Sequence, residues 1–386
     1  MPLRPEVSAA MQPFLTEAWG NPMSLHAGGD RPRAAIDDAR AEVAALIEAD
    51  SREIIFTSSG TEANNLALTG IALARAGRSG PRRIIISAVE HPSVSASCRA
   101  LETQGFRVIT LPVNPHGLVD PAELDALLTE PASLVSIQAA SGEIGTIQPI
   151  AKIGAITRRR GVPLHVDAVA AAGRIPLDVA AMQVDALSLS SNQLGGPPGA
   201  GALYVRRGIR LSPQLVGGMQ ERGRRAGLEA VPNVVGMGAA ARLARVELAE
   251  RWAQLDPLTR RLREGLQAQL DDWRLTGHPV ERLPGHLSLA IEYVEGEALV
   301  MALSRDGVAA AAGVTCRERT AWKASPTLLA LGLDQSLAQG AVIFSVWHGN
   351  TADEIDRALK IIAHGATHLR VLSPLYVPRR TAAPRS

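Results

Sequence analysis

The chain has 386 residues, of which 46% are hydrophobic and 20% charged, which is enough to bury the core of one large and one smaller domain. Its 40 Lys and Arg residues nearly match its 38 Asp and Glu residues and leave a net charge of +2, so nothing indicates nucleic-acid binding. No stretch approaches the ~18 apolar residues of a membrane-spanning helix, and the first residues lack the apolar run of a signal peptide. We therefore expect a cytoplasmic protein that has neither a membrane nor a nucleic acid as partner.

Residues 34–205 alternate between helical and strand patterns. Such alternation predicts βαβ units, and therefore an α/β fold with a mainly parallel central sheet that carries helices on both faces. The carboxyl ends of the strands are then the expected site of a ligand. After a helical pattern at 39–49, the strands are expected at 53–58, 82–87, 106–111, 133–138, 164–168, 186–191 and 201–205.

The pattern changes after residue 238. A long amphipathic helix is expected over 239–270, followed by a strand at 286–293, a helix at 296–303, a strand at 341–347 and a last helix from 352. We interpret these elements as a smaller C-terminal α/β domain. We expect residues 13–245 to form the large domain, residues 1–12 and 246–372 the small domain, and residues 373–386 a disordered tail.

The segment Ile54 to Asn65 predicts a strand that turns into a helix at Ser59, Gly60 and Thr61. Free N–H groups at a helix start, a glycine and hydroxyl side chains together suit a bound phosphate. The same residues are also typical of an ordinary capped helix, so this segment alone does not decide between the two interpretations.

Two further polar residues follow predicted strands. His91 comes just after one strand, and Asp167 ends another. An imidazole ring can stack on a pyridine ring, and a carboxylate can hold a pyridine nitrogen protonated. Taken singly, each residue could equally belong to a cap or a loop.

Taken together and in order, these segments resemble the IscS/NifS type of cysteine desulfurase, in the class V aminotransferase group of pyridoxal-phosphate (PLP) proteins. The motifs include GNPMSLHAGG, EIIFTSSGTEANNLAL, SAVEHPSV, GEIGTIQPI, LHVDA, GPPGAGALYVRRG and GGMQERGRRAG, and the similarity runs from Pro2 to Tyr376. The resemblance implies the PLP-dependent transferase fold of type I, a homodimer, and cofactor contacts at Ser59, Gly60, Thr61, His91, Asp167, Ser190 and Asn192.

The chain departs from the family where the covalent chemistry takes place. The family's lysine, which bonds to PLP, falls at Gln193, and the preceding histidine falls at Asn192. An amide nitrogen is neither a useful nucleophile nor a base, so we expect no covalently bound PLP and at most non-covalent binding. Of the three lysines, Lys152 and Lys360 are expected to be solvated on helices, and Lys323 follows the Cys316 loop.

Other contacts that the resemblance implies are also altered. The family's paired asparagines fall at Ser141 and Gly142, which removes the amide that contacts the phenolic oxygen of PLP, and a nearby glutamine is Ala170. The arginine that clamps the substrate carboxylate falls at His348, and the phosphate-binding threonine of the neighbouring subunit falls at Leu228. A planar guanidinium with constant charge is thus replaced by an imidazole of reference pKa ~6.5.

The two cysteines receive different interpretations. Cys316 aligns with the family's persulfide-forming cysteine, and the nearby Arg317, Arg319 and Lys323 would favour its thiolate, although Cys316 could also be a relic packed in a loop. Cys98 lies on the apolar face of a predicted helix and is expected to be part of the core. We expect no metal site.

These observations favour a pseudoenzyme that has lost desulfurase activity and serves as a partner, scaffold or sulfur carrier, through Cys316, in sulfur transfer or cofactor maturation. Its expected partners are a second copy of itself and either a true cysteine desulfurase or a sulfur-acceptor protein. One alternative is an enzyme that binds PLP or another phosphate ligand without a covalent bond and acts on a small amine or thiol. Another is a new reaction in the old pocket.

Overall fold

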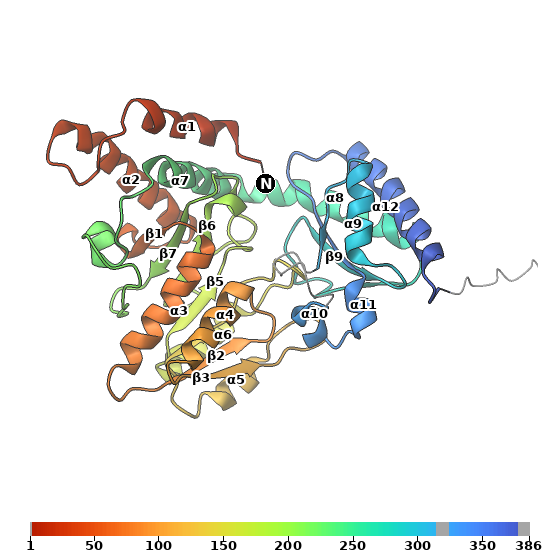
Figure 1. The fold of residues 1–386 in the computed structure, drawn as a ribbon, viewed down its shortest axis with the longest axis horizontal. Coiled ribbons are helices and arrows are strands. Elements are labelled where there is room, and N and C mark those ends of the chain that lie inside the picture. The colour runs from red at the N-terminus through yellow and green to blue at the C-terminus, as the bar shows by residue number, and fades with distance from the viewer. Residues whose placement is uncertain (1, 314–323, 377–386) are drawn as a thin grey trace, which may run out of the picture. The chain divides into compact units, whose positions relative to one another are not determined.

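The computed structural model describes residues 2–313 and 324–376, and their internal contacts separate two compact units (Figure 1). Unit 1 contains residues 2–114, 118–142 and 146–252. Unit 2 contains residues 115–117, 143–145, 253–313 and 324–376. Residues 2–12, which we expected in the small domain, lie in unit 1, where helix α1 (Pro5–Thr16) packs on α7 (Val231–Val246).

Unit 1 is built around a seven-stranded sheet of order β1-β7-β6-β5-β4-β2-β3. The prediction of a mainly parallel sheet is confirmed, and β7 is the exception because it runs antiparallel to both β1 and β6. The strands are β1 (Ile54–Thr57), β2 (Arg83–Ser87), β3 (Arg107–Leu111), β4 (Leu134–Ser136), β5 (Leu164–Asp167), β6 (Ala186–Ser190) and β7 (Gly201–Val205).

Helices cover the faces of this sheet, and every residue of β1, β2, β4, β5, β6 and β7 is buried (Figure 1). Strands buried on both faces read as continuous apolar runs such as Ile54–Phe56, which is why the sequence pattern located them. The other helices of this unit are α2 (Ala27–Leu46), α3 (Gly60–Ala76), α4 (Pro92–Glu102), α5 (Pro121–Leu127) and α6 (Ile150–Arg160), with short 3-10 turns η1 (Ser51–Glu53), η2 (Ser191–Leu194) and η3 (Gln220–Gly223).

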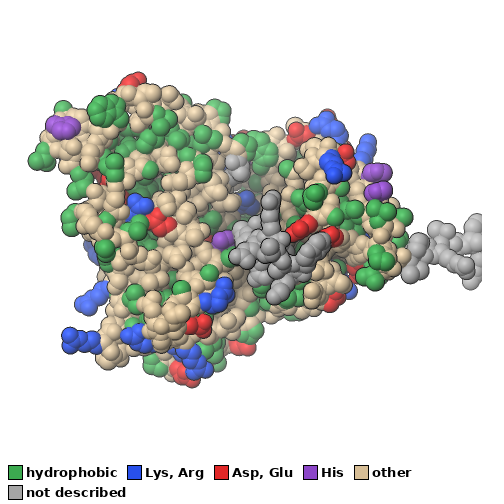
Figure 2. All heavy atoms as spheres, viewed as in Figure 1, with side chains coloured by type: hydrophobic (Ala, Val, Ile, Leu, Met, Phe, Trp, Pro, Cys, Tyr) green, Lys and Arg blue, Asp and Glu red, His purple; other side chains and the backbone are tan. Residues whose placement is uncertain are grey.

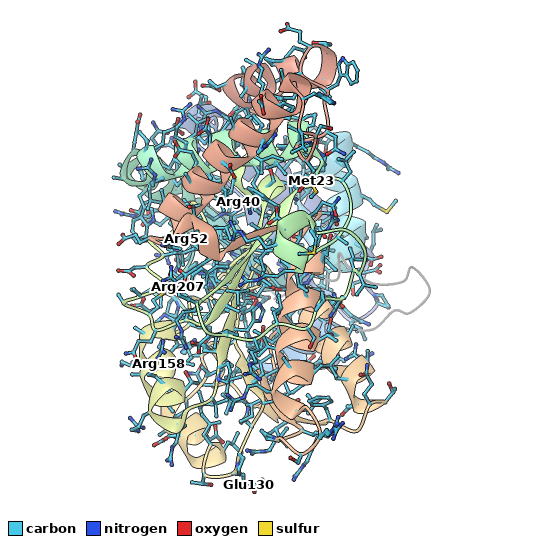
Figure 3. The ribbon with its side chains drawn as sticks, turned by 90° about the vertical axis from the view of Figure 1, so that its left-hand side faces the viewer. Met23, Arg40, Arg52, Glu130, Arg158 and Arg207 are labelled. Carbon is cyan, nitrogen blue, oxygen red and sulfur yellow. The ribbon has the colours of Figure 1, made fainter. Side chains whose placement is uncertain are left out.

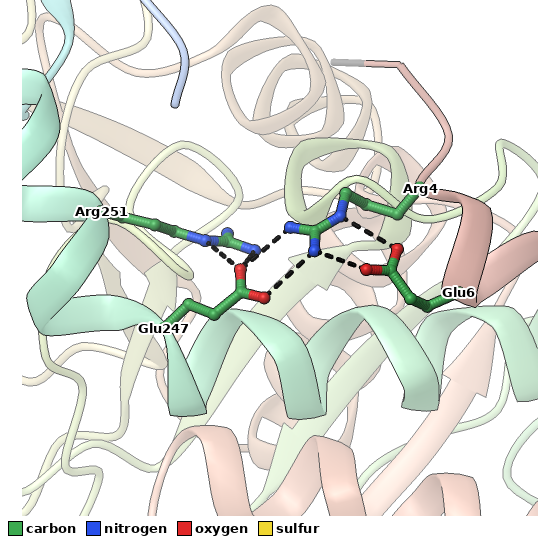
Figure 4. Close-up of polar contacts among 4 residues, drawn as sticks. All are labelled: Arg4, Glu6, Glu247 and Arg251. Carbon is green, nitrogen blue, oxygen red and sulfur yellow. Dashed lines mark hydrogen bonds and ion pairs between the residues drawn. The ribbon is translucent and has the colours of Figure 1, made fainter. Parts of the chain in front are cut away.

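The expected single helix over 239–270 is wrong, because the chain forms α7, which ends at Val246, and α8 (Leu248–Gln269). The break falls at Glu247, whose carboxylate accepts hydrogen bonds from Arg4 Nη1 (2.9 Å) and Arg251 Nη2 (2.9 Å) (Figure 4). Arg4 also pairs with Glu6 at 3.0 Å. The start of the chain is thereby tied to the end of α7 by charge-assisted bonds, which helix periodicity does not reveal.

The free edge of the sheet at β1 is covered by an ion pair. Arg40 on α2 binds both carboxylate oxygens of Glu221 on η3, at 2.7 and 2.8 Å. Arg40 Nη1 also donates to the Ile54 carbonyl (3.0 Å), and Glu221 Oε2 accepts from the Phe56 N–H (3.1 Å). The ion pair thus binds backbone groups of β1 that a neighbouring strand would otherwise bind. At this point the edge strand is therefore not free to pair with a strand of another chain.

Several arginines follow one another along this side of unit 1, namely Arg40, Arg52, Arg207 and Arg158 (Figure 3). Each has a carboxylate partner: Arg40 pairs with Glu221, Arg52 and Arg207 with Asp50, and Arg158 with Asp185. The row therefore carries its own counterions.

Unit 2 contains a four-stranded antiparallel sheet of order β10-β11-β9-β8. Helix α12 starts with a capping box formed by Thr351 and Glu354. The strands are β8 (Trp273–Leu275), β9 (His286–Ile291), β10 (Ala311–Ala312) and β11 (Ala341–Ser345), and the helices are α9 (Gly296–Arg305), α10 (Pro326–Ala330), α11 (Gln335–Gln339) and α12 (Ala352–Leu372), with the division between the units inside α8.

The end of the described chain differs from the expected tail. Residues 373–376 form a turn in which the Tyr376 ring lies 5.7 Å from the Tyr293 ring, and the rest of the expected tail lies outside the described residues. Within the described part of the chain, no helix is both long enough and apolar enough to cross a bilayer.

Candidate functional site

Asp167 ends β5 at the carboxyl edge of the unit 1 sheet and is 5% exposed. Its Oδ1 accepts from the Val169 N–H (3.0 Å) and its Oδ2 from Asn64 Nδ2 (2.7 Å). Burial raises the pKa of this carboxyl, while the two hydrogen bonds and nearby His91 act in the opposite direction. The expected carboxylate is therefore present and fixed in orientation.

His91 is the N-cap of α4, and its side chain is exposed. Its Nδ1 accepts from the Ser93 backbone N–H (3.1 Å) and lies 2.7 Å from Ser93 Oγ. Because a backbone N–H can only donate, Nδ1 must carry a lone pair, and the neutral ring holds its proton on Nε2. The cap thus fixes both the direction of the ring and its tautomer.

Asn64 connects these two residues, although the sequence analysis did not single it out. It lies on α3 at 1% exposure and donates to Asp167 Oδ2 and, at 2.9 Å, to Ser93 Oγ. Ser93 in turn contacts His91 Nδ1. A continuous chain of hydrogen bonds thus runs from His91 through Ser93 and Asn64 to Asp167. The signal in the sequence was an asparagine inside a helix, where it is a poor helix former.

The amino end of α3 combines the three residues predicted to form an anion cup. Ser59 is the N-cap and accepts from the Glu62 N–H at 3.1 Å. Gly60 is buried, and a Cβ there would lie 2.5 Å from Val169 Cγ2, so only glycine fits between this turn and the loop after β5. The Thr61 side chain is exposed. These residues can hold a phosphate, and they also form an ordinary cap.

Glu62 adds a negative charge beside the cup. Burial alone would raise the pKa of its carboxyl, but hydrogen bonds from Arg225 and Ser58 outweigh that effect and lower it. Arg225 Nε donates to Glu62 at 2.8 Å, and the Ser58 N–H donates at 2.7 Å. The carboxylate is thus satisfied by the protein itself and does not occupy the free N–H groups of the α3 turn.

Gln193, the residue that the resemblance aligns with a lysine, lies in the short turn η2, which directly follows β6. Ser190 Oγ donates to Asn192 Oδ1 at 2.6 Å, and Gly195 ends the turn with a φ of 87°. Asn192 is exposed, and Gln193 is half-buried. The backbone therefore presents a side chain at residue 193, but an amide offers no amine for a covalent bond to a carbonyl compound.

The remaining predicted residues belong to other segments of the chain. His348 belongs to unit 2, where its half-buried ring lies 4.9 Å from that of Trp347. Leu228 is 62% exposed in unit 1. Cys316 and Lys323 lie outside the described residues, as do Arg317 and Arg319.

Cys98 and the two described lysines agree with expectation. Cys98 has no exposed surface, and burial raises the pKa of its thiol to about 12, so it is a packing residue. Lys152 on α6 and Lys360 on α12 are both exposed. Within the described ranges no group of His, Cys, Asp or Glu side chains is arranged to hold a metal ion.

The arrangement fits the non-covalent contacts of PLP. Asp167 could hold a pyridine nitrogen, the exposed His91 ring is linked to it through Ser93 and Asn64, and the start of α3 offers the N–H groups of a helix amino end to a phosphate. Gln193 does not fit the covalent bond.

Comparison with known proteins agrees with these features. Residues 2–358 match the model of the aminotransferase class-V family. The cysteine desulfurase IscS of Methanosarcina thermophila is 42% identical over 97% of this chain and 92% of its own length, and the cysteine desulfurase of Mus musculus is 42% identical over 97% and 81%. A solved NifS-like protein superposes with a TM-score of 0.87 at 33% identity, over 95% of this chain and 97% of that chain.

Proposed function

Because the chain belongs to the class-V aminotransferase family, among the cysteine desulfurases, we propose that it is a desulfurase-like protein that no longer binds PLP covalently or releases sulfur from cysteine. It acts instead as a partner, scaffold or sulfur carrier in sulfur transfer or cofactor maturation. The observation that carries this proposal is Gln193, which occupies the η2 turn with a side chain that has no amine. PLP, when bound, supplies an electron sink, but no residue in this turn can take up or return a proton.

The carrier function would depend on Cys316 and needs no cofactor. A thiolate at Cys316 attacks the outer sulfur of a donor's persulfide, the sulfur–sulfur bond breaks, and the donor leaves as a thiolate, so that no oxidant is consumed. The basic residues Arg317, Arg319 and Lys323 support the thiolate form.

A second candidate function is favoured by the intact hydrogen-bond chain from His91 to Asp167. Four residues stay arranged as a ring-binding site, which supports non-covalent binding of PLP or a related phosphate ligand and action on a small amine or thiol. In that case Asp167 would hold a ring nitrogen, His91 would stack on the ring, and the α3 turn would bind the phosphate.

A homodimer and a cytoplasmic location complete the proposal. Apolar side chains gather on the surface over α1 and α2 (Figure 2). Leu25 is 99% exposed, Trp19 80%, Val216 81% and Met219 67%. Large exposed apolar side chains are typical of a protein interface, which supports a homodimer in which a second copy of the chain covers them.

The deciding experiment is an absorbance spectrum of the purified protein with and without PLP, followed by an assay of sulfide release from cysteine. We expect no borohydride-stable PLP and no sulfide. Sulfide release at the rate of an active desulfurase would overturn the first proposal. Colour that is lost on dialysis would favour the second candidate.

The carrier function has its own test. After incubation with an active desulfurase and labelled cysteine, the wild-type chain should carry labelled sulfur, and Cys316→Ser should not. The matched control is Cys98→Ser, since Cys98 is buried. Equal labelling of wild type and Cys316→Ser would exclude the carrier function.

A further inference from the structure

Glu90 lies between β2 and α4, directly before His91, and is 8% exposed. Its Oε1 accepts from Ser87 Oγ (2.5 Å) and from the Gln138 backbone N–H (2.9 Å). Its Oε2 is buried and has no hydrogen-bond partner among the described residues. Neither candidate function uses this carboxyl.

Gln138 also binds the loop of Glu90 through its own side chain. Its Nε2 donates to the carbonyl of Val89, the residue before Glu90. Gln138 follows β4, which pairs with β2 in parallel register, so both residues lie at the carboxyl edge of the sheet. The loop that carries His91 is thus joined to the loop after β4 by two reciprocal bonds, which we call the Glu90–Gln138 clasp.

The charge environment favours a neutral Glu90. Burial, and secondarily the negative charge of Asp167 on β5, raises the pKa of Glu90 to about 8. Cys98 on α4 is the other titratable group that faces it, and its thiol stays protonated. An ionised carboxylate with one unpaired oxygen is far more costly to bury than a neutral acid, so the proton belongs on Oε2.

We propose that Glu90 is a positioning residue, which in its neutral form closes the clasp, holds His91 in orientation and leaves Asp167 as the one anion at the β5 end of the site. The ligand-binding part of this inference rests on the second candidate function. Its conformational part does not, because the clasp is made by the protein alone.

A pH dependence follows from this geometry. Above its pKa, Glu90 becomes a second anion near Asp167, and its buried Oε2 has no donor among the described residues. The Ser87 and Gln138 hydrogen bonds favour the carboxylate, so the clasp opens only because water must enter to solvate Oε2. Because the folded pKa of this acid is raised above its usual value of 4.5, its neutral form favours the folded state at low pH, and that contribution is lost as the pH rises from 4.5 to about 8.

The first test needs no ligand. Nitrogen NMR of histidine-labelled protein, with His91 assigned by a His91→Asn variant, should show the Nε2–H tautomer at about pH 7 and a changed tautomer population at about pH 9.5. Glu90→Gln should keep the pH 7 signal throughout, since its amide keeps an acceptor for the Gln138 N–H and cannot ionise. The control is Glu102→Gln, which removes an exposed carboxyl at the end of α4 and should behave as wild type.

Infrared spectroscopy checks the proton itself. At about pH 7 the wild-type minus Glu90→Gln difference spectrum should contain the carbonyl stretch of a protonated carboxylic acid, which vanishes at about pH 9.5. A spectrum without this band, or a Glu90→Gln protein with the wild-type pH dependence of His91, would overturn the inference.

The second test uses PLP as the probe. Both affinities for PLP are corrected for the change that the titration of free PLP itself causes. Between pH 7 and pH 9.5 the wild-type affinity should then fall about tenfold, and the affinity of Glu90→Gln should fall less than about twofold. If PLP binds neither protein at any pH, the second candidate function fails, while the NMR and infrared results still decide whether Glu90 positions His91. Equal pH profiles for both proteins would refute the ligand-binding part.

Discussion

The two ends of the candidate site, both at the carboxyl edge of one sheet, are held together to very different degrees. At β5, the four residues from His91 to Asp167 depend on one another, and three of them are buried. At β6, the η2 turn carries Asn192 and Gln193 on a backbone that Gly195 and the Ser190–Asn192 bond hold without help from residue 193. A reactive group can therefore be lost from the turn at little cost in stability, whereas any loss at β5 leaves a buried polar group without its partner.

The largest effect should come from restoring the amine. In Gln193→Lys the η2 turn would present an amine at the position that the resemblance aligns with a lysine, so treatment with PLP and borohydride should attach roughly one PLP per chain, against none in wild type. Peptide mass spectrometry locates the adduct at position 193. The matched control is Asn192→Lys, one residue earlier and exposed, and equal labelling of the two variants would show that the turn does not direct residue 193 to the ring-binding end.

The next largest effect concerns the β5 end itself. Asp167→Asn keeps the shape of the side chain but removes its charge, so non-covalent PLP should bind about 10- to 100-fold more weakly, as expected for the loss of a charge-assisted hydrogen bond. Fluorescence titration measures the change, with the exposed Asp38→Asn as control. Unchanged affinity would place PLP elsewhere.

A smaller effect is expected on stability. Asn64→Ala removes the donor to Asp167 Oδ2 and to Ser93 Oγ, leaving buried acceptors without partners, and should lower the free energy of unfolding by about 1–3 kcal/mol. Urea denaturation at neutral pH gives the value. A loss below about 0.5 kcal/mol would mean that the hydrogen-bond chain is not cooperative.

The smallest effect should be found at the η2 turn. Asn192→Ala removes one bond of an exposed side chain and should change the free energy of unfolding by less than about 0.5 kcal/mol. The same denaturation experiment compares it with Asn64→Ala. Equal losses in the two variants would contradict the difference between the two ends.

The sequence predicted the parts of this molecule that local patterns encode. Apolar runs located the strands, and Asp167 and His91 were found because Asp167 ends one such run and His91 lies in the loop after another. Asn64 and Glu90 were missed because their partners lie 103 and 48 residues away, and nothing local indicates such a pairing. The break at Glu247 was missed for the same reason, since it is bound by Arg4, which lies 243 residues away in sequence.

The covering of β1 has a consequence for how the chain is made. Among the described residues, Ile54–Thr57 pairs only with β7, and its outer edge meets Glu221, so these contacts come from segments that leave the ribosome about 144 residues or more later. Until then an apolar, β-prone tetrapeptide is exposed on the nascent chain. Translation that stalls between these segments should therefore yield fragments that aggregate or require a chaperone, even though the finished protein has no such tendency at this strand.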